Sequence, residues 1–411
     1  MTANVQVITF GCRLNSYESE AIGNMLREVV DAPSFDGRDI IIFNGCAVTT
    51  EAERQLRQSI RRIRRERGAN PIVGVVGCAA QVNGNAYADM PEVDFIVGNS
   101  GKFDVNNYLN FRERPVVVED ISSQRNFNSL RPLRGFENRS RAFVQVQDGC
   151  DNNCTFCITR FARGKSVSLP AEKILDQIKR FIDSNYREIV LTGVNICDYG
   201  KNLEANLTLG GLVVRILRET TVERLRLSSL DIAGMDRQLV DSIKYEKRLM
   251  PHVHLSLQSG NDVILRRMLR RHSREEVCER CSDILEVRRE LVIGADFIAG
   301  FPTETEDMHR DSITMIDSLP VTYGHIFPFY ERPGTKATLM PQLHRKLRKK
   351  RAKELREHAA ANLKKLRESL KGTTQKVLIE TGNLGRLENY LQINLSGNYG
   401  DKIGSIVDLI L

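Results

Sequence analysis

The chain has 411 residues, long enough for two or three domains whose hydrophobic cores need no disulfide support. Hydrophobic residues make up 41% of it and charged residues 27%, a balance that excludes a fully disordered or collagen-like protein. No run approaches about 18 uninterrupted apolar residues, and the N-terminus lacks the pattern of a secretory signal. We therefore expect a soluble, cytoplasmic protein with no membrane segment.

Positive charge is concentrated in one segment. The chain carries 60 Lys and Arg against 52 Asp and Glu, and residues 341–371 hold twelve of these basic residues with only three Glu. Such a local excess predicts a polyanionic partner, of which RNA is the obvious one in the cytoplasm. A solvated helix face is the alternative interpretation.

The first hundred residues alternate β-branched runs with helical stretches, a pattern that predicts a parallel sheet built from βαβ units. The expected strands are 5–10, 40–43, 72–76 and 95–97, and the expected helices are 19–30 and 51–67. Residues 1–110 are interpreted as an N-terminal α/β domain. Residues 111–140 are polar, contain Pro115 and Pro132 with one expected strand at 116–118, and are interpreted as a linker.

Residues 141–370 repeat the α/β alternation on a larger scale, which predicts a barrel-like domain. Its six expected strands are 143–147, 189–191, 225–228, 253–257, 295–298 and 323–329, with helices that include 171–184, 274–290 and a long basic helix at 342–370. Short runs at 377–380, 390–395 and 405–411, separated by glycine-containing turns, predict a small β-domain over residues 371–411.

The strongest chemical signal is the spacing C-x3-C-x2-C formed by Cys150, Cys154 and Cys157, just beyond the first strand of the barrel-like domain. Three thiolates can hold three irons of a four-iron cluster and leave the fourth iron open to a substrate or cofactor. Zinc is the alternative, but zinc favours a fourth side-chain ligand, and no other Cys or His lies within about thirty residues on either side.

This triad, with Phe156 before its last cysteine, resembles the cluster motif of the radical S-adenosylmethionine (SAM) enzymes. The resemblance implies that the open iron binds the amino and carboxylate groups of SAM. It also implies that the cluster supplies the electron that cleaves SAM to methionine and a 5′-deoxyadenosyl radical.

A second set of cysteines is independent of the first. Cys12, Cys46 and Cys78 each follow an expected strand of the N-terminal domain by a few residues, and each is preceded by glycine. If the strands are parallel neighbours, the three sulfurs meet at one edge of the sheet, where the glycines would let the backbone approach a bulky cluster. Three buried structural cysteines are the alternative, and a second three-cysteine cluster is the interpretation that we favour.

Two such cysteine sets in this order, followed by a small β-domain, resemble the radical SAM methylthiotransferases over nearly the whole chain. The motifs that carry the resemblance are Gly11-Cys12-Arg13-Leu14-Asn15-Ser16-Tyr17-Glu18-Ser19, Gly77-Cys78-Ala79-Ala80-Gln81, Gln147-Asp148-Gly149-Cys150, Ala162-Arg163-Gly164, Leu255-Ser256-Leu257-Gln258-Ser259-Gly260 and Asp296-Phe297-Ile298-Ala299-Gly300-Phe301-Pro302. The run from Asn15 to Ser19 looks most like the branch that acts on threonylcarbamoyladenosine next to the tRNA anticodon.

The resemblance implies an N-terminal parallel-sheet domain, a central partial (β/α)6 radical SAM barrel and a small C-terminal β-barrel of the TRAM type, which binds RNA. It also implies SAM contacts at the ends of barrel strands. The residues expected there are Gly193, Ser228, Ser256, Gln258 and Gly300. They are small or hydrogen-bonding residues, as a ligand close to the backbone requires, although barrel interiors also need small residues for packing.

The activity implied by the resemblance is insertion of sulfur and a methyl group at carbon 2 of the modified adenine. The motif cysteines (Cys150, Cys154 and Cys157) would hold the 4Fe–4S cluster that generates the radical, and the auxiliary cysteines (Cys12, Cys46 and Cys78) a second 4Fe–4S cluster that supplies the sulfur. Both clusters would then face one cavity. We expect a tRNA substrate, a reductant such as flavodoxin or ferredoxin, and a monomeric protein.

Two other activities stay open at the level of the sequence. One is the same chemistry on a ribosomal protein aspartate, or on another tRNA adenosine. The other is a non-catalytic iron–sulfur protein that binds RNA. Outside the two cysteine sets, Cys197, Cys278 and Cys281 are expected to be structural, the last two on one face of the helix at 274–290. His252 and His254 are expected to be packing or hydrogen-bonding residues rather than metal ligands.

Overall fold

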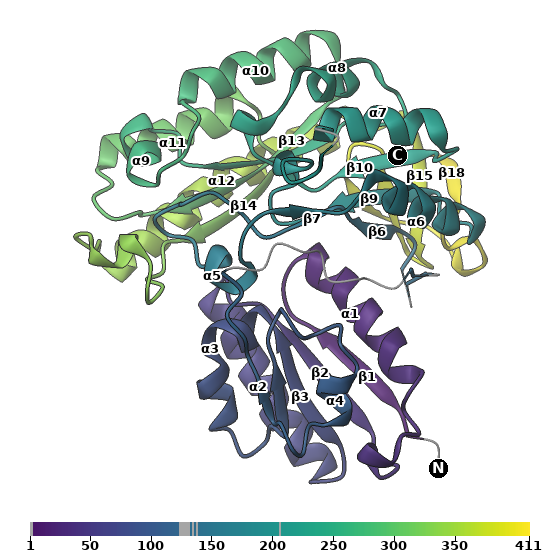
Figure 1. Ribbon diagram of the computed structural model, residues 1–411. Helices are drawn as coiled ribbons and strands as arrows, with labels where there is room; N and C mark the ends of the chain where they lie inside the picture. Colours follow the sequence, from purple (N-terminus) through teal and green to yellow (C-terminus); the bar gives the residue numbers. More distant parts are fainter. Residues whose placement is uncertain (1–2, 123–131, 134, 137–138, 205–206) are drawn as a thin grey trace. The chain divides into compact units, whose positions relative to one another are not determined.

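The computed structural model describes residues 3–122, 132–133, 135–136, 139–204 and 207–411 (Figure 1). The chain forms two compact units. The first comprises Met1–Leu133, Gln147–Asn152 and Cys157–Leu169, and the second comprises Arg134–Val146, Asn153–Phe156 and Pro170–Leu411. The loop that carries the motif cysteines therefore contributes residues to both units.

The first unit is built on a parallel sheet with the strand order β1-β2-β3-β4-β5. Its strands are β1 (Val5–Thr9), β2 (Ile40–Gly45), β3 (Ile72–Gly77), β4 (Phe95–Val97) and β5 (Val116–Val117). Its helices are α1 (Arg13–Arg27), α2 (Thr50–Arg67), α3 (Cys78–Ala88), α4 (Asn106–Leu109) and α5 (Thr159–Arg163), and the short strands β7 (Gln147–Asp148) and β8 (Val167–Ser168) pair antiparallel.

Both faces of this sheet are covered, so β2 and β3 are buried along their whole length. Alternate residues of a strand point to opposite faces, and Ile40 and Ile42 accordingly belong to one hydrophobic cluster while Ile41 and Phe43 belong to the other. The second cluster includes Leu56, Ile60 and Ile63 of α2, whose spacing places them on one side of the helix. Most arginines of α2 are exposed, whereas Arg57 lies over the Tyr87 ring and Arg64 pairs with Asp94.

Several elements of this unit differ from the sequence-based expectation, and helices α3, α4 and α5 were not predicted. Helix α1 begins at Arg13 instead of residue 19, because Cys12 occupies its N-cap position. Strand β5, expected within the linker, pairs with β4 as the fifth strand of the sheet. In the rest of the expected linker, residues 123–131, 134 and 137–138 lie outside the described residues.

The second unit contains the barrel strands, and all of their pairings are parallel. They are β6 (Ala142–Gln145), β9 (Glu188–Thr192), β10 (Arg224–Leu227), β11 (Ser229–Leu230), β12 (His252–Gln258), β13 (Val292–Ala299) and β14 (Tyr323–Pro328). They form two sheets, β10-β9-β6 and β11-β12-β13-β14, and a parallel bridge between Leu225 and Leu249 lies next to the join. The six expected strands are all present, and β11 is an additional two-residue strand.

Seven helices of the described second unit accompany these strands: α6 (Ala171–Asp183), α7 (Leu209–Glu219), α8 (Arg237–Tyr245), α9 (Asp262–Arg267), α10 (Arg274–Val287), α11 (Glu306–Ser318) and α12 (Arg345–Ser369). The α/β barrel fold expected from the sequence is confirmed. Helix α12 is the predicted basic helix. Its buried side includes Ala352, Leu355 and Ala359, whereas most of its cations are exposed.

The C-terminal segment forms an antiparallel sheet with the order β17-β16-β15-β18. Its strands are β15 (Thr374–Thr381), β16 (Leu384–Leu387), β17 (Gln392–Asn394) and β18 (Ile406–Ile410), of which β16 was not predicted. Arginines at the beginning of barrel strand β10 bind this sheet: Arg224 donates to the Lys376 carbonyl and Arg226 to the Glu388 carbonyl. The small β-domain is thus packed against the amino ends of the barrel strands.

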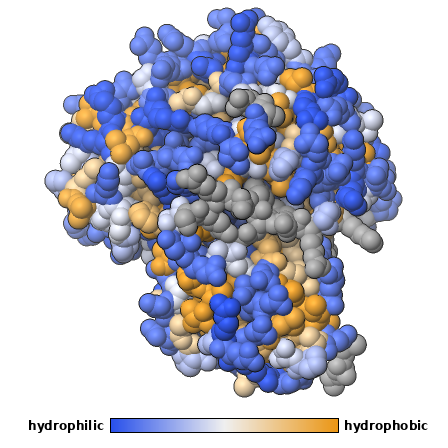
Figure 2. Space-filling view, in the orientation of Figure 1, coloured by the Kyte–Doolittle hydropathy of each residue, from blue (hydrophilic) through white to orange (hydrophobic). Residues whose placement is uncertain are grey.

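The side chains exposed on the molecule are mainly polar. Hydrophilic residues cover most of the face shown in Figure 2. Within the described parts of the chain, no helix is both long enough and apolar enough to cross a membrane.

Candidate active site

The auxiliary cysteines lie at the carboxyl ends of three adjacent parallel strands, as the sequence predicts. Cys46 and Cys78 directly follow Gly45 and Gly77, which are partners in the register of β2 and β3, and Cys12 precedes α1 just after β1. The three thiols are close enough for Cys12 and Cys78 to influence the pKa of Cys46. Parallel strand ends meet at one sheet edge, so this loop–strand geometry gathers three sulfurs from distant parts of the sequence.

The glycines before these cysteines are required by the packing of the chain itself. A Cβ atom on Gly11, whose φ is +128°, would lie 2.8 Å from the Cβ of Cys46. A Cβ atom on Gly77, whose φ is +83°, would lie 2.3 Å from Asn44 Oδ1. The sequence suggested that the glycines make room for a cluster, whereas here they make room for neighbouring strand ends.

The chemistry of these thiols fits a metal cluster. Cys46 and Cys78 are buried and Cys12 is exposed, so the group is accessible from one side. Burial, with the nearby Cys78, raises the pKa of the Cys46 thiol to about 12, and the thiol is therefore protonated at neutral pH when it binds no metal. A metal would have to displace that proton, as it does in other cysteine sites.

A buried arginine points at one of these sulfurs. The side chain of Arg163, at the end of α5, donates from Nε to Cys78 Sγ at 3.1 Å. Its Nη1 and Nη2 atoms lie 2.6 and 3.1 Å from the two carboxylate oxygens of Glu18, and they also bind Asp148 Oδ1 at 3.0 Å and Asn15 Oδ1 at 3.2 Å. All five N–H groups of the guanidinium are therefore used.

A second buried cation completes this network. Lys102 Nζ lies 2.7 Å from Glu18 Oε1 and 2.7 Å from Asn99 Oδ1. The Asn99 amide in turn donates to Cys78 Sγ at 3.5 Å and to the Ala162 carbonyl at 2.6 Å. Burial alone would raise the pKa of Glu18, but Arg163 and Lys102 outweigh it and hold that pKa at about 2.

The motif cysteines are half-buried and lie on a loop whose conformation depends on glycine. Gly149 has φ +69°, and a Cβ atom there would lie 1.9 Å from the Lys165 carbonyl oxygen. The Cys150 amide donates to the Gly164 carbonyl at 3.1 Å, and Cys157 Sγ accepts from the Thr159 amide at 3.4 Å. These contacts fix the two ends of the loop within the first unit.

The middle of the loop belongs to the second unit, where Cys154 also faces a buried arginine. Arg270 Nη1 lies 3.7 Å from Cys154 Sγ, and Arg270 Nη2 donates to Asp231 Oδ1 at 2.9 Å and to the Ser256 carbonyl at 2.7 Å. Burial would raise the pKa of Asp231, but hydrogen bonds from His272 and charges from its arginine neighbours keep it below its ordinary value.

The residues expected to contact SAM occur at strand ends of the second unit. Gly193 and Ser228 directly follow β9 and β10, Ser256 and Gln258 belong to β12, and Gly300 follows β13.

Two of these residues have properties that fit a ligand. Ser228 Oγ is buried and has no hydrogen-bond partner among the described residues. Gln258 has φ +73°, a backbone conformation that is uncommon outside glycine and is often kept at functional sites. The amide of Gly300 is already used, because it donates to Glu304 Oε2 at 2.8 Å.

Two histidines and an aspartate form a further polar group on β12, β13 and β14. His254 Nε2 and His325 Nδ1 lie 3.0 and 3.4 Å from the same oxygen of Asp296. Such a donor set can accept a metal ion, but the hydrogen bonds to Asp296 already explain why the three side chains lie together. Burial would raise the pKa of Asp296, but the two histidines keep it below its ordinary value. His252 stacks on Tyr390 of the C-terminal segment, with ring centroids 4.5 Å apart.

The remaining cysteines lie away from both sets. Cys197 is buried, and burial raises its pKa to about 12. Cys281 is buried and Cys278 half-buried on α10.

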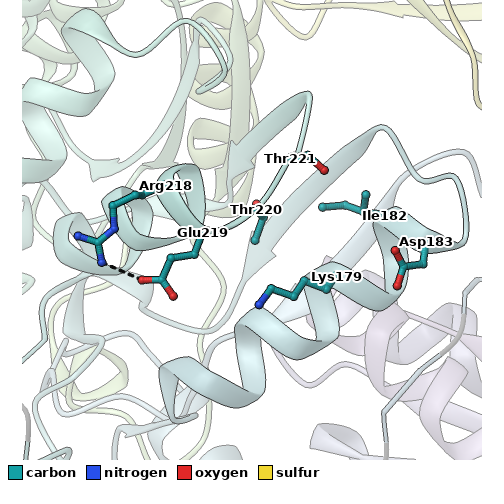
Figure 3. A pocket seen from close by; sticks show the side chains of 7 residues that line it. All are labelled: Lys179, Ile182, Asp183, Arg218, Glu219, Thr220 and Thr221. Carbon is teal, nitrogen blue, oxygen red and sulfur yellow. Dashed lines mark hydrogen bonds and ion pairs between the residues drawn. The ribbon is translucent and has the colours of Figure 1, made fainter.

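Figure 3 shows a pocket of the second unit. It lies near the amino ends of β9 and β10, whereas the predicted SAM contacts lie at or just after the carboxyl ends of barrel strands. Its lining comes from the C-terminal ends of α6 and α7, which precede β9 and β10, and consists of Lys179, Ile182, Asp183, Arg218, Glu219, Thr220 and Thr221. Arg218 and Glu219 pair with each other at 2.9 Å. Because active sites of α/β barrels lie at the carboxyl ends of strands, this pocket is not the candidate site.

Sequence reasoning found the cysteines but missed the charged residues around them. Glu18 and Arg163 lay inside motifs used for the family resemblance, yet nothing in the sequence pairs them, since they are 145 residues apart. Lys102, Arg270 and Asp231 lie outside every motif that the sequence analysis used.

Comparisons with known proteins agree with this geometry. Residues 144–316 match the family model described as Radical SAM superfamily, and residues 4–98 match the one described as Uncharacterized protein family UPF0004. The radical S-adenosylmethionine methyltransferase TsrM from Kitasatospora setae, solved with cobalamin and a 4Fe–4S cluster, has a similar fold. It aligns with a TM-score of 0.60 at 12% identity, over 82% of this chain and 74% of that one.

Sequence relatives extend over almost the whole chain. The threonylcarbamoyladenosine tRNA methylthiotransferase MtaB of Rickettsia prowazekii is 41% identical over 95% of this chain and 91% of its own length. The protein of the same name from Aquifex aeolicus is 36% identical over 98% of each chain. The tRNA-2-methylthio-N(6)-dimethylallyladenosine synthase of Christiangramia forsetii is 28% identical over 92% of this chain and 84% of its own length. The chain therefore belongs to the threonylcarbamoyladenosine tRNA methylthiotransferase family of radical SAM proteins.

Proposed function

We propose that the protein is a tRNA methylthiotransferase that adds sulfur and a methyl group to carbon 2 of threonylcarbamoyladenosine. The observation that carries this proposal is that Cys12, Cys46 and Cys78 lie together at one edge of the sheet. The segment that follows Cys157 contacts this site through Arg163, which binds Cys78. A radical SAM protein needs only one cluster to cleave SAM, so a second three-cysteine site implies a second task, which is the supply of sulfur. The names of the relatives supply the substrate.

The donor sets fit two 4Fe–4S clusters and SAM. The motif cysteines would hold one cluster and the auxiliary cysteines the other, each set leaving one iron without a protein ligand. When bound, the cofactors supply one-electron cleavage of SAM and the sulfur and methyl groups that are transferred. The buried Ser228 hydroxyl offers a hydrogen bond to SAM, and the left-handed backbone at Gln258 turns the end of β12 toward such a ligand.

The RNA would bind through its phosphates to the basic face of α12. Ten of the twelve Lys and Arg residues in 341–371 are exposed, and only Arg348 and Arg351 are buried. Arg348 pairs with Glu331 at 3.0 Å and Arg351 with Glu304 at 2.9 Å, so these two stabilise the packing of the helix. Phosphate contacts position an RNA without reading its sequence, and the adenosine itself must be recognised elsewhere.

Three further properties accompany this proposal. Reduction of the motif cluster requires an electron donor such as flavodoxin or ferredoxin. A tRNA substrate would agree with a location in the cytoplasm. We expect it to act as a monomer.

The test is mass spectrometry of nucleosides from tRNA incubated anaerobically with reconstituted protein, SAM and reductant. Wild type, Cys12→Ala and Cys154→Ala are compared on tRNA that carries threonylcarbamoyladenosine. A methylthio-threonylcarbamoyladenosine peak with wild type alone supports the proposal.

Other outcomes would assign another function. Methylthiolation of dimethylallyladenosine instead would contradict the substrate, as would SAM cleavage with no change in any tRNA nucleoside, which would favour a protein substrate. RNA binding without SAM cleavage would identify a non-catalytic iron–sulfur protein.

A further inference from the structure

Arg163 occupies an unusual position for a charged side chain. It is 6% exposed, and its guanidinium uses one N–H to reach Cys78 Sγ and the other four to reach three polar side chains. Its carboxylate partner Glu18 is entirely buried. A buried arginine needs this degree of pairing, because an unsatisfied buried charge is costly.

The charges around Cys78 leave a place for an anion at the sulfur. Arg163 and Lys102 are both buried cations and share the single buried carboxylate of Glu18. Asp148, the other carboxylate partner of Arg163, has a side chain that is 22% exposed and is therefore less effective as a buried counter-charge. A negatively charged group bound at Cys78 would therefore lie beside buried positive charge that Glu18 alone does not balance.

Both N–H donors to Cys78 Sγ are held by partners that do not involve the other cysteines. The Asn99 amide is fixed by Lys102 and by the Ala162 carbonyl, and Arg163 is fixed by Glu18. The protein's own contacts therefore fix the position of both donors. Hydrogen bonds to cluster sulfurs, together with buried positive charge, favour the reduced, more negative state of an iron–sulfur cluster.

We propose that Arg163 is a positioning residue that raises the reduction potential of the auxiliary cluster through its N–H···S hydrogen bond to Cys78. This inference rests on the proposed function, because it requires a cluster on the auxiliary cysteines. The residue that would adjust this reduction potential, Arg163, lies on the chain segment that follows Cys157. The same side chain binds Asp148, two residues before Cys150, so one guanidinium joins the auxiliary cysteines to the beginning of the motif loop.

The experiment isolates the auxiliary cluster by replacing Cys150, Cys154 and Cys157 with Ala in the full-length chain. The reduction potential is then measured by a titration followed by electron paramagnetic resonance, in this parent and with Arg163→Gln or Arg163→Lys added. We expect Arg163→Gln to lower the reduction equilibrium constant about tenfold, which is 59 mV for one electron. Arg163→Lys, which keeps the charge but loses the bidentate geometry, should give a smaller shift.

Arg160→Gln is the matched control, since it removes an exposed arginine from the same helix and should leave the potential unchanged. Equal potentials for the parent and Arg163→Gln, at equal iron and sulfide content, would overturn the proposal. Loss of the cluster in both Arg163 variants, with the fold retained, would also overturn it, because the residue would then be structural. If the parent itself binds no cluster, the proposed function fails, and this inference fails with it.

Discussion

An arginine faces a cysteine sulfur in each unit of the molecule, but the two surroundings differ. In the first unit Arg163 Nε lies 3.1 Å from Cys78 Sγ, and in the second Arg270 Nη1 lies 3.7 Å from Cys154 Sγ. Each arginine is fixed by a buried carboxylate, Glu18 or Asp231. A common arrangement thus accompanies both cysteine sets.

The two arginine–carboxylate pairs differ in how deeply their partners are buried. Glu18 pairs with two fully buried cations, whereas Asp231 shares its charge with Arg271, whose side chain is 44% exposed. Cys78 is buried and Cys154 half-buried. The enclosed surroundings of Cys78 would let the protein influence a cluster bound there, and the more open surroundings of Cys154 would suit a cluster that binds SAM.

The largest expected effect comes from replacing cysteines, because each cysteine set is proposed to support a different step of the reaction. Cys154→Ala should abolish both SAM cleavage and methylthiolation, because it would remove a ligand of the proposed radical-generating cluster. Cys78→Ala should abolish methylthiolation and leave SAM cleavage measurable as deoxyadenosine. Cys281→Ala, a change of a buried cysteine on α10, is the control and should retain both activities. Loss of SAM cleavage in Cys78→Ala at normal iron content of the motif cluster would contradict this division.

The second effect concerns stability and compares the two carboxylates. Glu18→Gln leaves Lys102 without its carboxylate partner and Arg163 with Asp148 alone, and it should lower the free energy of unfolding of the first unit by about 3–5 kcal/mol. Asp231→Asn should cost the second unit less, because Arg271 can turn toward water. Hydrogen exchange of the β2 and β12 amides reports the two units separately.

Glu51→Gln is the surface control for this comparison. Glu51 pairs with Arg54 where both side chains are more than half exposed, so its replacement should produce no measurable change. An effect of Glu18→Gln as small as that of Glu51→Gln would show that the buried network does not stabilise the first unit.

The pH dependence of stability provides a third comparison. The pKa of Glu18 is about 2 in the folded chain against an ordinary value of 4.5, because Arg163 and Lys102 outweigh burial. A carboxyl with a depressed folded pKa contributes stability that is complete above its unfolded pKa and is lost as pH falls toward its folded pKa.

The metal-free wild type should therefore lose roughly 3 kcal/mol of stability from this group between pH 4.5 and pH 2. Glu18→Gln should lack this loss. Urea unfolding of both proteins across that range measures the difference, and parallel pH profiles would refute the assignment of the effect to Glu18.

The smallest effect lies outside both cysteine sites, on α12. Replacing Lys346, Lys349 and Lys365 with Gln should weaken tRNA binding and make the dependence of log K on log salt shallower by about 0.7–0.9 for each phosphate that is no longer neutralised. Lys179→Gln on α6 is the control and should leave the slope unchanged. An unchanged slope in the triple variant would remove α12 from the RNA interface.

The sequence predicted the parts of the fold that follow from local pattern. Alternating strands and helices, with a cysteine after each of β1, β2 and β3, were enough to place the auxiliary cysteines at one sheet edge, because parallel strands end together. The start of α1 was misplaced because Cys12 is a poor N-cap residue by composition, and β16 was missed because it is four residues long and contains Gly385.

The charged networks could not be predicted, because they depend on tertiary contacts. Arg163 meets Glu18 only after α5 has packed against α3 within the first unit, and Arg270 meets Asp231 only after the barrel strands have assembled. No local pattern distinguishes these arginines from the many exposed ones on α2 and α12. Burial of a charge is a property of the folded chain, and it is the feature that marks these residues for function.

The most direct measurement is the iron content of three anaerobically reconstituted proteins: wild type, the variant with the motif cysteines replaced by Ala, and the variant with the auxiliary cysteines replaced by Ala. We expect about eight iron ions per chain in the wild type and about four in each variant, with a distinct paramagnetic signal for each cluster. About four iron ions in the wild type, and none after replacement of the motif cysteines, would contradict the assignment of a cluster to Cys12, Cys46 and Cys78.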